Sequence, residues 1–219
     1  MSEPAELPDF AEVTAEYRLA IHPTTVGQYW HYLLASGRQS AADPRLHGFP
    51  AGTGLRIGPG GGIELDERSA ALPVTGVSWH GARAYCDWLA EQLGADCRLP
   101  TAAEWQHAAA GPDRLRWALG NEFDRARYAP TAAGPRPVQD WPANGFGLCG
   151  LTGNVFEWCA DPLTMPSGAA DPLLGSRVIK GGAYTVRNPE SFENSTVFTA
   201  DELSTVPYIG FRVLSARPG

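Results

Sequence analysis

Regular sequence periodicity is confined to three short stretches of this 219-residue chain, which limits the folds open to it. Apolar residues recur at helical spacing after Thr25, Ser78 and Thr101, three residues that favour helix N-caps. Elsewhere the 25 glycines and 19 prolines, about a fifth of the chain, predict long loops instead of a helical bundle. The 38–63 segment is predicted to be a loop or flap over the core.

Short strands are predicted at 177–180 and 208–214. In the second, Ile209, Phe211 and Val213 alternate with Gly210, Arg212 and Leu214, as expected for a strand buried on at least one face. The periodic segments and these strands together predict an α+β chain of low regular secondary structure.

Four blocks occur in order along the chain: Arg98–Trp105 (RLPTAAEW), Gly147–Trp158 (GLCGLTGNVFEW), Gly181–Tyr184 (GGAY) and Gly210–Val213 (GFRV). They resemble the blocks of the formylglycine-generating enzyme, or sulfatase-modifying factor, family over about residues 15–214. The resemblance implies the irregular C-type-lectin-like fold of that family. It divides the chain into an N-terminal extension, 1–14, and a single domain, 15–219.

Charge and composition restrict the classes of partner. A net charge of −7 argues against a nucleic-acid surface, which requires a basic face. No stretch reaches the ~20 apolar residues of a membrane span, and the acidic N-terminus does not read as a secretory signal. We therefore expect a cytoplasmic protein that binds neither nucleic acid nor a membrane. Its expected partner is a small-molecule or peptide substrate. The four cysteines are expected to be reduced, structural thiols.

The resemblance also indicates which chemistry to exclude. In the copper-dependent oxidases of the family, two cysteines follow the Gly-Gly-Ser-Tyr block and bind copper as thiolates. Here those positions are Val186 and Ser191, so no copper is expected and formylglycine generation is not predicted. The helical domain and His-x3-His-x-Glu motif of the family's iron enzymes are also missing from this sequence.

Calcium is the cofactor that the resemblance allows. It implies a site formed by Glu157 and by the carbonyls of Gly153 and Val155, which is oxygen chemistry suited to Ca²⁺. Gly150 replaces the family's Asp or Asn ligand. The site could therefore be weak, could take a water in place of that ligand, or could be empty with Glu157 bonded to backbone N–H groups.

The polar 184–195 segment is the predicted active surface, because relatives place their active site or variable surface there. Glu190 or Glu193 would act as general base and Arg187 as an anion clamp. The alternative is a solvated loop. The predicted catalytic residues are Glu190, Glu193, Arg187 and Ser191, and the predicted substrate-binding residues are Tyr184, Phe156, Asn188 and Asn194.

Two functions from different classes follow. The first is a biosynthetic, oxidoreductase-type enzyme that acts on a small peptide or an amino-acid-derived metabolite without the copper cysteines. The second is a non-catalytic binding module, such as a diversified receptor or an immunity-type protein, which holds a ligand or protein partner. The glutamates and phenylalanines of the 191–199 segment fit a diversified receptor less well, so the sequence favours the enzyme.

Three charged residues outside this loop are predicted to be structural. Glu104 completes a capping box with Thr101. Arg98 and Arg212 are expected to tie loops to carboxylates or backbone carbonyls. Most of the seven tryptophans should fill the core.

Overall fold

The computed structural model describes residues 7–129, 133–162 and 175–217. Within these ranges the helices are α1 (Val26–Ala35), α2 (Trp79–Leu93), α3 (Ala102–Ala110) and the single turn α4 (Arg125–Tyr128). Short 3-10 turns are found at Arg38–Ser40, Glu67–Ser69, Val138–Asp140 and Pro189–Phe192. Most of the remaining backbone is loop.

The strands form two four-stranded sheets and one hairpin. The first sheet has the order β1 (Phe10–Glu12), β2 (Tyr17–Ala20), β10 (Leu214–Ala216), β5 (Asp96–Arg98). The second has the order β8 (Phe198–Asp201), β7 (Ser176–Lys180), β6 (Phe156–Pro162), β9 (Ile209–Gly210). The hairpin joins β3 (Leu55–Ile57) to β4 (Ile63–Leu65).

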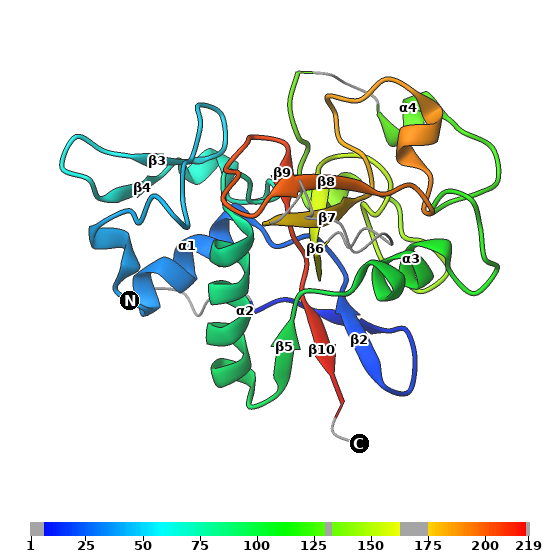
Figure 1. Cartoon of the computed structure of the whole chain (residues 1–219), viewed down its shortest axis with the longest axis horizontal. Coiled ribbons are helices and arrows are strands. Elements are labelled where there is room, and N and C mark those ends of the chain that lie inside the picture. The colour runs from blue at the N-terminus through cyan, green and yellow to red at the C-terminus, as the bar shows by residue number, and fades with distance from the viewer. Residues whose placement is uncertain (1–6, 130–132, 163–174, 218–219) are drawn as a thin grey trace, which may run out of the picture.

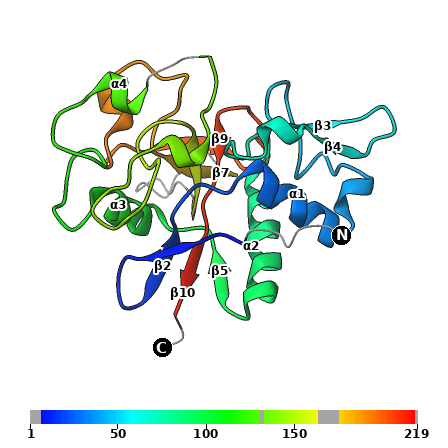
Figure 2. The same cartoon turned by 180° about the vertical axis from the view of Figure 1, so that it is seen from behind.

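Figures 1 and 2 show how these elements are arranged. The helices α1 and α2 and the β3–β4 hairpin lie on one side of the two sheets, and α3 and α4 lie on the other. The β6–β9 pair is parallel, whereas the other strand pairs of the described chain are antiparallel. Residues 10–12, inside the predicted N-terminal extension, form β1 and pair with β2.

The helix predictions are confirmed with their caps. The side chains of Thr25, Ser78 and Thr101 each accept a hydrogen bond from the backbone N–H at the third helical position of α1, α2 and α3. Gly94 ends α2 in the left-handed conformation, where glycine has no Cβ penalty. These signals are local, which is why the sequence sufficed to predict them.

One loop expectation and one strand expectation need correction. The predicted 38–63 loop contains the turn Arg38–Ser40, strand β3 and the start of β4, and an Arg56–Glu64 pair crosses the hairpin. The predicted 208–214 strand is divided: Ile209–Gly210 pairs with β6, and Leu214 begins β10 in the other sheet. Alternation along one segment cannot reveal that its two ends belong to different sheets.

Aromatic residues fill much of the interior, as predicted. Trp105 and Trp158 are fully buried, and a satellite cluster of Trp117, Tyr128 and Phe192 lies beside the main core. Trp30 and Trp88 are only partly buried. The four cysteines are buried and unpaired.

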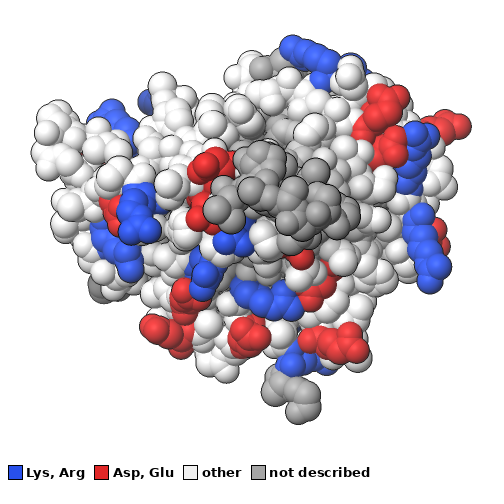
Figure 3. All heavy atoms as spheres, viewed as in Figure 1, with Lys and Arg blue, Asp and Glu red and all other residues white. Residues whose placement is uncertain are grey.

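Two surface properties can be stated for the described ranges. No helix in them combines the length and apolar character needed to cross a membrane. On the face shown in Figure 3, basic and acidic side chains alternate instead of gathering into one basic area.

Candidate functional site

The predicted general base Glu193 is held in an ion pair. Arg116 Nη2 donates to Glu193 Oε1 at 2.5 Å, and this hydrogen bond lowers the pKa of the Glu193 carboxyl. A catalytic carboxylate is expected to have a raised pKa and a free oxygen. Its neighbour Asn194 is buried, and its amide nitrogen donates to the Leu115 carbonyl. Both side chains thus anchor the loop and do not face an open site.

The other predicted catalytic side chains lie on the surface or within the turn of the loop. Arg187 and Glu190 are exposed, as is the predicted substrate contact Asn188. Ser191 is half-buried within the 3-10 turn Pro189–Phe192. Arg187 is fixed through its backbone carbonyl, which accepts a hydrogen bond from Arg125. The loop therefore presents Arg187, Asn188 and Glu190 to solvent.

The two predicted aromatic contacts have different fates. Phe156 belongs to the core, where its ring packs edge-on against Phe198, so it does not face a substrate. Tyr184 is half-buried at the start of the loop, and its hydroxyl donates to the Pro207 carbonyl at 3.3 Å. Tyr184 also lines the pocket described below, whereas Phe156 does not.

Glu157, the predicted calcium ligand, is buried in an ion pair with Arg212. Arg212 Nη2 donates to Oε1 at 2.8 Å and its Nε donates to Oε2 at 2.9 Å, while Trp105 Nε1 donates to Oε2 at 2.7 Å. The charge that would attract a cation is neutralised by the guanidinium, so these residues do not fit a calcium site. One alternative from the sequence was an empty site in which backbone N–H groups bond to Glu157. The donors to its carboxylate are instead the side chains of Trp105 and Arg212.

Arg212 has the structural role predicted for it. Besides Glu157 it donates to the carbonyls of Ala20, Ile21 and Cys149, at 2.8–2.9 Å. Arg98 similarly makes a bidentate pair with Glu104, at 2.7 and 2.8 Å. Arg212 thus links the end of β2, the loop at Cys149 and strand β6, and Arg98 links β5 to the start of α3.

The Gly153–Asn154 pair organises a pocket that sequence reasoning missed. The Asn154 amide binds the Arg136 backbone twice: its Oδ1 accepts from the N–H at 2.9 Å and its Nδ2 donates to the carbonyl at 3.1 Å. The Asn154 carbonyl also accepts from Tyr184 N–H at 2.9 Å. A Cβ on Gly153 would lie 1.9 Å from the Tyr128 carbonyl oxygen, so only glycine allows that close approach.

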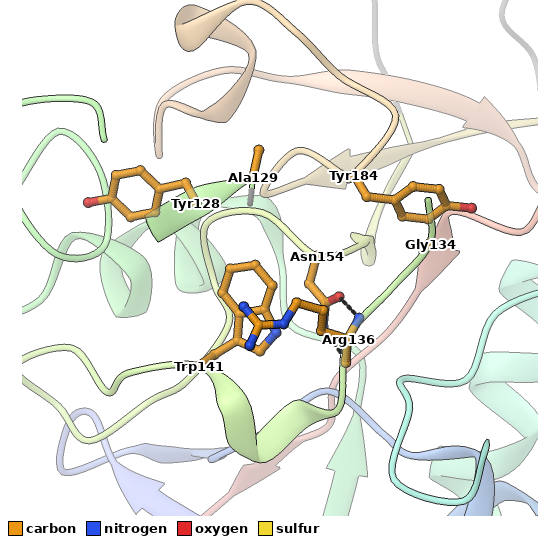
Figure 4. Close-up of a pocket in the computed structure, with 7 residues that line it drawn as sticks. All are labelled: Tyr128, Ala129, Gly134, Arg136, Trp141, Asn154 and Tyr184. Atoms are coloured by element: carbon orange, nitrogen blue, oxygen red, sulfur yellow. Dashed lines mark hydrogen bonds between the residues drawn. The ribbon is translucent and has the colours of Figure 1, made fainter. Parts of the chain in front are cut away.

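The pocket lies among the three segments that this pair connects. It is lined by Tyr128, Ala129, Gly134, Arg136, Trp141, Asn154 and Tyr184. Figure 4 shows the Arg136 side chain across the Trp141 indole, with the hydroxyls of Tyr128 and Tyr184 directed away from it. Asn154 was in a recognised block, but Arg136 and Trp141 carry no periodicity or motif that could have indicated the site.

Comparison with known families gives a match along almost the whole chain. Residues 2–217 match the model of the sulfatase-modifying factor enzyme 1-like domain. The chain belongs to this family. The chain is 34% identical to the formylglycine-generating enzyme of Thermomonospora curvata. The match covers 64% of this chain and 54% of that protein.

Other relatives are much longer. The chain is 37% identical to the serine/threonine-protein kinase pkn1 of Chlamydia caviae over 76% of its length, but this covers only 28% of that protein. It thus spans less than a third of the kinases it matches and about half of the formylglycine-generating enzyme. The names of those proteins refer to their full lengths, of which this chain matches only a part.

Solved structures confirm the predicted fold. PvdO from Pseudomonas aeruginosa superposes with a TM-score of 0.70 at 22% identity, covering 92% of this chain and 80% of that one. Treponema denticola variable protein 1 superposes with a TM-score of 0.68 at 20% identity, covering 92% and 84%. At these identities the likeness establishes the α+β fold of the formylglycine-generating family.

Proposed function

We propose that the chain is a binding module, which holds a peptide or protein partner on the 185–197 loop. The observation that supports this is a fixed backbone with outward side chains. Phe192 is fully buried, Trp117 Nε1 donates to the Pro189 carbonyl at 3.3 Å, and Thr196 Oγ1 donates to the Glu190 carbonyl at 2.6 Å.

A loop fixed in this way loses little conformational entropy when a partner binds. Its exposed side chains are chemically varied, which suits recognition. They are Thr185, Arg187, Asn188, Glu190, Ser195 and Val197. One of the two predicted bases, Glu193, is instead used to hold the loop on Arg116.

The test is site-specific crosslinking in the native host, with a photoreactive residue at Asn188. Mass spectrometry would identify the partner, whose affinity would then be measured with and without Arg187→Ala/Glu190→Ala. We expect this double variant to lose tenfold or more in affinity, because Arg is enriched among the hot spots of protein interfaces. Arg38→Ala/Glu91→Ala, the same charge change at exposed positions outside the loop, is the control. Equal affinity of both variants would refute the proposal.

The second candidate is an oxidoreductase-type biosynthetic enzyme for a small peptide or an amino-acid-derived metabolite. The 34% identity to a formylglycine-generating enzyme favours it. Moles of Ca, Cu, Fe and Zn per chain, measured on protein purified without chelators, would test it first. Stoichiometric copper or iron would support the enzyme. If activity toward such a substrate survived in the Glu190→Gln/Glu193→Gln variant, neither glutamate could be the general base.

A further inference from the structure

The Trp141 indole has an unused hydrogen-bond donor at the pocket. Trp141 is only 6% exposed, and its Nε1 has no hydrogen-bond partner among the residues that the structure describes. By contrast, Trp79, Trp105, Trp117 and Trp158 all donate to a carbonyl or a carboxylate. A buried indole N–H normally finds an acceptor, and leaving it without one is costly. The unused donor therefore indicates a missing acceptor.

A second donor lies beside the first. The Arg136 guanidinium carbon is 5.9 Å from the centre of the Trp141 ring (Figure 4). Its one side-chain bond within the described ranges is a 3.4 Å contact to Asp140, in a pair whose side chains are 40% and 39% exposed. A guanidinium has five N–H donors, so most of them are available. A positive group and a neutral N–H together favour an anionic acceptor over a neutral one.

The walls of the pocket are fixed before any ligand arrives. Asn154 holds the Arg136 backbone by two hydrogen bonds and Tyr184 by a third. The Trp141 ring lies close to the backbone at Gly150 and Gly153, where an added Cβ would lie 3.7 and 3.5 Å from it. The pocket is smaller than the roughly 300–1,000 Å³ of sites that enclose a whole small molecule, so it suits one functional group of a larger ligand.

We propose that this pocket binds a carboxylate, with the Trp141 indole N–H and the Arg136 guanidinium as its two donors. The planar guanidinium matches the geometry of a carboxylate. The carboxylate belongs either to a small free acid or to the C-terminus of a peptide. None of the described residues that line the pocket belongs to the 185–197 loop, so this site does not depend on the partner proposed for that loop.

The experiment is a titration of the ¹⁵N-labelled full chain, followed by its indole N–H signals in two-dimensional NMR. The probes are sodium N-acetylglycine and the neutral N-acetylglycinamide, with sodium chloride matching the ionic strength. We expect one indole signal to move saturably with the acid and much less with the amide. That signal should be missing in Trp141→Phe, whereas Trp88→Phe removes a different signal and leaves the response unchanged.

Arg136→Gln should weaken binding of the acid by about tenfold, because the charge-assisted bond is lost. This residue is partly exposed, so the variant keeps the test valid if Trp141→Phe does not fold. Comparison of acetate with N-acetyltriglycine separates the two sources, since only a peptide site should bind the longer acid more tightly. A Trp141 signal that stays fixed, or that moves equally with the amide, would overturn the proposal.

Discussion

The buried Glu157–Arg212 pair offers the sharpest test of what holds the fold together. Its two side chains are 1% and 0% exposed, and the guanidinium also serves three backbone carbonyls. We predict that Arg212→Met lowers the free energy of unfolding by about 3–5 kcal/mol, the usual cost of leaving one buried charge unpaired. For a domain of this size that corresponds to a melting temperature about 6–20 °C lower.

A second substitution separates the charge from the packing. In the wild type, Glu157→Gln should destabilise the protein, because it leaves Arg212 without its counter-charge. In the Arg212→Met background the same change should stabilise it, because it removes the uncompensated carboxylate. Arg56→Met is the matched control: its pair with Glu64 has side chains 77% and 47% exposed, so we expect a loss of less than about 1 kcal/mol.

Calorimetry and urea unfolding of the four proteins in this cycle provide the assay. The decisive quantity is the sign of the Glu157→Gln effect in the Arg212→Met background. An effect that is destabilising in both backgrounds, and of equal size, would show that the pair is not energetically coupled. It would refute the reasoning from burial.

Three further predictions concern other parts of the chain. Gly153→Ala should lower the free energy of unfolding by several kcal/mol or prevent folding, because the new Cβ would meet a backbone carbonyl. Gly147 also has a positive φ but has open space around it, so Gly147→Ala should cost only about 1–2 kcal/mol. Chemical denaturation of both variants is the measurement. The hydrogen bond from Arg98 lowers the pKa of Glu104 to about 2, below its ordinary 4.5, so its contribution to stability is present above pH 4.5 and is lost as the pH falls toward 2. Acid titration of Glu104→Gln should therefore show a flatter stability profile in that window. Desolvation lowers the pKa of Lys180 to about 8 from 10.5, so stability should rise between pH 8 and 10.5, and this rise should be missing from the melting temperatures of Lys180→Met.

The candidate site was the part least accessible from sequence. The sequence placed Glu157 at a calcium site and the 184–195 loop at an active centre, both from resemblance. Whether Glu157 can receive a cation depends on Arg212, which is 55 positions away along the chain. Whether Glu193 can act as a base depends on Arg116, 77 positions away. Neither contact leaves a pattern in the local sequence.

What the sequence by itself determined was local or carried by motifs. Thr25, Ser78 and Thr101 start the helices because each side chain satisfies a backbone N–H only three residues onward. The four ordered blocks determined the family and its fold. The sequence also indicated that Arg212 is structural, because an irregular fold needs long, multiply donating side chains.

Only the tertiary structure decided which distant segments meet. Leu19 pairs with Leu214, and Leu214 pairs in turn with Arg98, so one short strand unites three remote parts of the chain. Strands of two to four residues carry too little periodicity to predict such pairing. The pocket has the same origin, since Arg136, Trp141 and Tyr184 are brought together by the hydrogen bonds of Asn154 and by space that Gly153 leaves open. The physical reason is that these contacts depend on closing long loops, whose outcome is set by the packing of the whole domain.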